Sequence, residues 1–232
     1  MLVPMSTMAW FEVPDRAASP AATFTPFGRI AAAATLALGA AFQFAAFVTM
    51  PAFDETADRL RWIAENEARA DLSKVFDILA MPFLFGTVLV YVLLTRQRSA
   101  KLAYAGGALL TCGMVGLSAS QGFEVLQFTL AQDGRFSIAA LADAVDNISS
   151  PPAITMLLLF IPGAFFGLLT MTVALWRSRA VPLVPVLLIP AFIVLDLPLQ
   201  QGVAAHAVAL VGACWIGWAI LRATPPADPS RT

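Results

Sequence analysis

Runs of about 20 apolar residues constrain this sequence more than any other feature. A membrane-spanning helix needs about 20 mainly apolar residues, because the hydrocarbon core of a bilayer is about 30 Å thick. Six stretches of the sequence meet this requirement, so we expect an all-α fold: a polytopic bundle of six transmembrane helices. The six predicted spans are residues 28–50, 76–95, 102–130, 152–176, 181–199 and 203–221.

The composition supports a membrane protein and excludes two other classes. Only 12% of the residues are charged and 59% are hydrophobic, whereas soluble domains have about 25% charged residues. This excludes a disordered chain, which needs low hydrophobicity and high charge. A net charge of −1 argues against nucleic-acid binding, which needs a basic face. The chain has 12 Arg but two Lys and is rich in Ala, a usage that indicates a bacterial source.

The basic residues predict the orientation of the spans. Segments 96–101 and 177–179 hold five basic residues and no acid, and positively charged loops stay in the cytoplasm. We therefore expect a multi-pass protein of the bacterial inner membrane. Its cytoplasmic tails would be residues 1–27 and 222–232, flanking a six-helix domain at 28–221. Nine basic residues fall on the cytoplasmic side, and the five expected outside are Arg59, Arg61, Arg69, Lys74 and Arg135.

Two predicted outer loops have the apolar spacing of amphipathic helices. In 52–76 and 137–148, apolar residues recur every three or four positions. In the first loop, Glu55–Arg59 and Glu65–Arg69 are spaced as favourable i,i+4 ion pairs. Such helices can lie on the membrane–water interface or cover the bundle as a lid, and the sequence leaves both arrangements open.

Polar residues within the spans are the candidate functional residues, because ionisable groups in a membrane are costly and usually face the bundle interior. All of them fall in the predicted outer half. They predict a polar cavity there that could bind a small molecule, a lipid or a proton. The alternative is a structural network that fixes helix register, with Asp77 merely at headgroup depth. The ligand or proton-relay candidates are Glu124, His206, Asp196, Gln43, Gln127 and Ser120, with Gln121, Gln200 and Gln201 nearby.

Small residues on the third span predict close helix packing below this region. At 100° per residue, one stripe of the span carries both the small residues and Glu124. Stripes of small residues mark close contacts between membrane helices. The stripe therefore predicts that Glu124 points into the bundle. Its members are Gly106, Gly113, Gly116, Ser120, Glu124 and Gln127.

The sequence predicts no catalytic residue, metal or cofactor. His206 is the single histidine of the chain, which excludes a haem held by two histidines of one subunit and a multi-histidine zinc site. Cys112 and Cys214 lie in apolar runs without the spacing of a metal or redox motif. We interpret both as small apolar residues.

Two segments resemble known membrane proteins. The run PGAFFGLLTMTVALWRSRAVPLVPVLLI at 162–189 resembles small six-span bacterial integral membrane proteins, a resemblance that implies an inner-membrane location and no particular activity. The run AAHAVALVGACWIGW at 204–218 is similar to the last helix of rhomboid proteases, with His206 at the catalytic position. Pro162 or Ile161 stands where the nucleophilic serine would be, so we interpret the rhomboid likeness as coincidental.

Three functional hypotheses follow. The first is an integral membrane protein without catalytic machinery, such as an accessory factor of the envelope. The second is a small proton-coupled transporter, or a protein that binds a lipid or small molecule, using Glu124 and His206. The third, ranked last, is a membrane enzyme acting on a lipid or quinone with Glu124 as general base. The sequence does not predict an oligomeric state.

Overall fold

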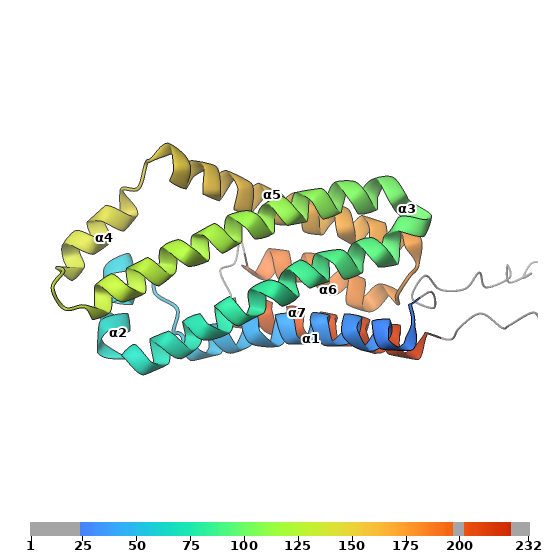
Figure 1. Cartoon of the computed structure of the whole chain (residues 1–232), viewed down its shortest axis with the longest axis horizontal. Helices are drawn as coiled ribbons and strands as arrows, with labels where there is room; N and C mark the ends of the chain where they lie inside the picture. Colours follow the sequence, from blue (N-terminus) through green and yellow to red (C-terminus); the bar gives the residue numbers. More distant parts are fainter. Residues whose placement is uncertain (1–23, 197–201, 224–232) are drawn as a thin grey trace, which may run out of the picture.

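The computed structural model describes residues 24–196 and 202–223. Within them the fold is all-α, as predicted, with seven helices and no strand (Figure 1). Most of both predicted tails, the end of the predicted fifth span, and Gln200 and Gln201 lie outside the described residues. The helices are α1 (Pro26–Thr49), α2 (Thr56–Glu65), α3 (Glu67–Gln132), α4 (Ile138–Asp146), α5 (Pro151–Ser178), α6 (Leu183–Asp196) and α7 (Gly202–Arg222).

Helix α3 is a hairpin that contains the second and third predicted spans. Its 66 residues are interrupted by non-helical backbone angles at Ser99 (φ −142°, ψ 46°), where the chain turns back on itself (Figure 1). We call residues 67–98 the first leg and residues 100–132 the second leg. Hydrogen bonds from Gln132 to Asp71 and from Lys74 to Gln121 join the two antiparallel legs.

Several helices are long and apolar enough to cross a membrane. Helices α1, α3, α5 and α7 meet this condition by length and composition, whereas the apolar α6 has 14 residues. The fifth span was predicted over 181–199, and α6 begins at Leu183. The far end of this predicted span lies outside the described residues. The largest apolar core joins residues from α1, both legs of α3, α5, α6 and α7.

The small-residue stripe of the second leg packs directly against α5, so the predicted close helix contact is confirmed. A Cβ atom added to Gly113 would lie 2.5 Å from the backbone N of Ala164 and 2.9 Å from the backbone C of Gly163. A Cβ added to Gly116 would meet the backbone N of Phe160 at 2.5 Å. Only glycine lets the two backbones approach this closely.

Helices α2 and α4 form a cap over the far ends of the two α3 legs, which project beyond α1 (Figure 1). The cap packs on these ends through an apolar core that is separate from the larger core of the bundle. We call this the cap end of the molecule, and the end containing Ser99 and the α5–α6 connection the turn end. The core of the cap consists of Leu60, Ile63, Ala70, Phe128, Ala131 and Ala142.

The cap confirms one of the two amphipathic helices and corrects the other. Helix α4 lies within the predicted 137–148, but the predicted helix over 52–76 breaks at Asn66, and residues 67–76 belong to α3. Neither predicted ion pair forms: the break separates Glu65 from Arg69, and Arg59 instead donates a hydrogen bond to Gln127. This contact fastens α2 to the second leg of α3.

Candidate functional site

A buried ammonium group is the centre of the main polar cluster. Lys74 Nζ lies 3.0 Å from Asp77 Oδ2 and 2.8 Å from Gln121 Oε1, and it forms an ion pair with Glu124. Gln43 Nε2 of α1 donates to Asp77 Oδ1 at 3.1 Å. These five residues, which we call the charge cluster, join α1 to both legs of α3.

Helical spacing and the hairpin register explain why these side chains meet. Lys74 and Asp77 are three residues apart on the first leg, a spacing that places them on one helix face. The antiparallel second leg brings Glu124 opposite Lys74, and the aromatic ring of Phe128 lies 5.1 Å from the ammonium nitrogen. One cation is thus shared by two carboxylates, and each of its three N–H donors has a polar partner.

Lys74 was not predicted as a site residue, because the sequence places it in the amphipathic helix expected over the outer loop 52–76. The structure instead buries it inside α3. One signal was available: Leu72, Val75 and Phe76 continue the apolar run of the second span backwards through Lys74. A lysine within such a run, three residues before Asp77, indicates a paired charge.

His206 lies in a separate, largely aromatic pocket. Its ring stacks on Phe47 of α1 at 3.8 Å between centroids and meets Phe192 of α6 edge-on at 5.4 Å. Its Nδ1 is 2.8 Å from the carbonyl oxygen of Gly202, and the Asp196 carboxylate is farther away at 3.9 Å. The hydrogen-bond contact is therefore local to the first turn of α7, and the Asp196 carboxylate lies beyond hydrogen-bond distance.

The charge cluster and the His206 pocket contact neighbouring positions of α1. Gln43 binds the charge cluster and Phe47 stacks on His206, and these α1 residues are one helical turn apart. The structure therefore places Gln43, Glu124, Asp196 and His206 in one region of the bundle.

The other two candidates lie at the edge of this region. Gln127 is buried and binds Arg59 of α2, so it belongs to the attachment of the cap. Ser120 is half-buried and makes no hydrogen bond within the described residues. The structure therefore separates these two candidates from the charge cluster.

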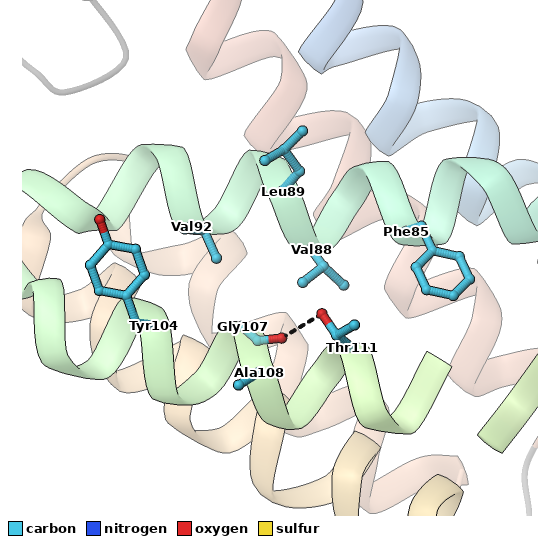
Figure 2. A pocket seen from close by; sticks show the side chains of 8 residues that line it. All are labelled: Phe85, Val88, Leu89, Val92, Tyr104, Gly107, Ala108 and Thr111. Carbon is cyan, nitrogen blue, oxygen red and sulfur yellow. Dashed lines mark hydrogen bonds between the residues drawn. The ribbon is translucent and has the colours of Figure 1, made fainter. Parts of the chain in front are cut away.

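Two hollows of the structure lie away from the charge cluster and are mainly apolar. One, of about 480 Å³, lies between the second leg and the start of α5, beside Gly116 and Pro152. The other, of about 230 Å³, lies between the two legs of α3 (Figure 2). A polar cavity at the cluster itself stays a prediction.

The chemistry available to the charge cluster is ionic pairing and proton exchange. The described residues contain no group of three or more His, Cys, Asp or Glu side chains that could hold a metal ion. Buried ion pairs of this kind hold helices in register. Their carboxylates are also the groups that membrane proteins use to carry protons.

Comparisons with protein-family models, curated proteins and solved structures found no match. The class of the protein therefore rests on its fold. The described residues form an all-α bundle with several helices long and apolar enough to cross a membrane, an architecture compatible with a helical membrane protein.

Proposed function

We propose that this chain is a six-span protein of the bacterial inner membrane, with both termini in the cytoplasm, and that its working surface is the cap. The α3 hairpin supplies two of the six spans, and α6 belongs to the fifth. In this arrangement the cap end faces the periplasm. The function is that of a non-enzymatic envelope protein that presents the cap outside the membrane.

The charge distribution supports this orientation. Among the described residues, the turn end carries seven basic residues, and all twelve acids lie in or toward the cap end. Loops rich in Arg and Lys stay in the cytoplasm. The basic residues of the turn end are Arg29, Arg96, Arg98, Lys101, Arg177, Arg179 and Arg222.

The observation that carries the function is the separate construction of the cap. Helices α2 and α4 pack on the ends of the α3 legs through an apolar core distinct from that of the bundle, and the cap projects beyond α1 (Figure 1). One polar link attaches it to α3, the hydrogen bond from Arg59 to Gln127. Within the cap, Thr56 Oγ1 of α2 donates to Asp146 of α4 at 2.6 Å. A segment that only connected two spans would not need two helices packed on a distinct apolar core.

Cysteine labelling tests the orientation. In a chain with Cys112 and Cys214 replaced by Ala, Ala139→Cys places a thiol on the exposed face of α4, and Gln97→Cys places one at the turn. We expect a membrane-impermeant maleimide to label Ala139→Cys in intact spheroplasts and Gln97→Cys only after lysis. The opposite pattern would refute the proposed orientation.

Two point variants separate the cap hypothesis from the transporter hypothesis. Ala144→Arg adds a bulky charge to the exposed face of α4, whereas Glu124→Gln removes a carboxylate from the charge cluster. If the cap is the working surface, Ala144→Arg at normal protein level reproduces the phenotype of cells lacking the chain, and Glu124→Gln does not. The converse result would refute the cap hypothesis.

A proton-coupled function is the second candidate, and the observation that favours it is that the charge cluster and the His206 pocket both contact α1, through Gln43 and Phe47. The ion pairs of Lys74 with Asp77 and Glu124 therefore lie near the pocket of His206 and Asp196. Such chains of ionisable groups carry protons in transporters. Proton uptake by the purified protein in liposomes, lost in Glu124→Gln, would support this candidate.

A further inference from the structure

A hollow between the two legs of α3 opens on the surface of the bundle near the turn end. Its floor is formed by the buried Val88 and Gly107, and its sides include Phe85, Leu89 and Tyr104 (Figure 2). Leu89 is 59% exposed and Tyr104 is 60% exposed. The lining is apolar apart from hydroxyl groups, so the hollow fits a hydrocarbon chain.

Two basic residues stand at the turn-side end of this hollow. Arg96 follows Leu89 by seven residues and Val92 by four on the first leg, and Lys101 precedes Tyr104 by three on the second leg. Residues at these spacings share a helix face. Both cations are exposed, and within the described part of the chain neither forms an ion pair or hydrogen bond.

Exposed aromatic residues indicate the depth of this end in a membrane. Tyr104, Trp176 and Trp218 are each at least half-exposed, and all three lie within about one helical turn of a basic residue. Arg222 lies 4.3 Å from the ring of Trp218. Tyr and Trp gather where headgroups meet acyl chains, which places the cations at headgroup depth and the hollow at acyl depth.

We propose that this hollow binds one acyl chain of an anionic glycerophospholipid, whose phosphate lies between Arg96 and Lys101. Charge complementarity identifies the occupant, because the described residues at this end carry seven basic groups and no acid. Zwitterionic lipids offer the same phosphate but neutralise it with their own cation. The inference rests on the proposed membrane location, although not on the direction in which the chain is inserted.

Native mass spectrometry of the detergent-solubilised full chain tests the proposal. Phosphatidylglycerol and phosphatidylcholine with identical acyl chains are titrated against the wild type and three variants. Arg96→Gln/Lys101→Gln removes both cations, and Ala108→Leu fills the hollow without changing the charge. Arg177→Gln/Arg179→Gln is the matched control, because it removes two exposed cations of the same end that lie on α5 and after it.

We expect the wild type to retain phosphatidylglycerol in preference to phosphatidylcholine. Loss of Arg96 and Lys101 should weaken this binding about 30-fold, since each basic residue near an anionic surface contributes about fivefold. Ala108→Leu should also weaken it, and the α5 control should change it less than about threefold.

Four results would overturn the proposal. They are equal retention of both lipids, an equal loss in the α5 control, displacement of the lipid by an equal concentration of inorganic phosphate, and an acidic protein retained in place of lipid. Circular dichroism of each variant establishes that it is folded. Lipid binding in detergent does not depend on orientation, so this test can fail while cysteine labelling succeeds, and the reverse.

Discussion

Removing the shared cation of the charge cluster should destabilise the protein far more than removing either of its anions. Lys74 neutralises both Asp77 and Glu124. Lys74→Met therefore leaves two carboxylates without a cation in a largely buried region. Asp77→Asn and Glu124→Gln each leave one complete ion pair behind.

The geometry sets the size of the effect. The side chains of Lys74 and Asp77 are 8% and 13% exposed and their charged atoms are 3.0 Å apart, which corresponds to an attraction of about 5–6 kcal/mol at an effective dielectric constant of about 20. Breaking such a buried pair from one side costs about 3–5 kcal/mol. We expect Lys74→Met to lower the free energy of unfolding by that amount. Each single carboxylate variant should lower it by about 1–2 kcal/mol.

Reversible unfolding in mixed micelles, followed by tryptophan fluorescence and circular dichroism, measures these differences. The matched control is Arg61→Met, because the Arg61–Asp58 pair is about half exposed at both side chains and should contribute less than about 1 kcal/mol. The triple variant Lys74→Met/Asp77→Asn/Glu124→Gln should regain most of the lost stability, since it leaves no unpaired charge. A Lys74→Met variant no less stable than Arg61→Met would refute the reasoning.

Three further substitutions test other features of the bundle. Gly113→Val should lower the free energy of unfolding by about 1–3 kcal/mol, because its Cβ would lie 2.5 Å from the backbone of Ala164. The control is Gly122→Ala, whose added Cβ would meet no atom within 4 Å. Thermal unfolding midpoints report this difference, and equal midpoints would contradict the close α3–α5 packing. Ser99→Ala should be neutral or stabilising, because the buried Ser99 hydroxyl has no hydrogen-bond partner in the described structure. Burying an unpaired hydroxyl costs about 1–3 kcal/mol. A clear destabilisation, measured by the same method, would show that the hydroxyl is paired. His206→Ala should lower the free energy of unfolding by about 2–4 kcal/mol through lost aromatic packing, whereas His206→Phe should retain most of the stability. Equal losses of the two variants in chemical denaturation would show that the hydrogen bond of His206, and not its ring, stabilises the protein.

The apolar helices could be predicted from the sequence because the signal is local. A run such as 152–176 carries enough apolar residues to indicate a span, whatever it packs against. The close contact at Gly113 could also be predicted, since small residues at helical spacing mark a packing face. The α4 helix followed from the same kind of periodicity.

The partners of these helices could not be predicted, because they depend on register between distant segments. The pairing of Lys74 with Glu124 is set by the position of the hairpin turn, and the turn at Ser99 contains neither Gly nor Pro. The stripe containing Gly113 and Glu124 indicated one common face. Tertiary packing instead divides it, so that the glycines meet α5 and Glu124 meets the first leg.

The separation of acids and bases along the bundle also makes the molecule an electric dipole. In the proposed orientation its positive pole lies inside the cell and its negative pole outside. A membrane potential that is negative inside contributes about 2.3 kcal/mol per elementary charge for each 100 mV crossed. The field therefore favours export of the acidic cap and retention of the basic turns. The energised membrane itself would then help to select the topology as the chain inserts.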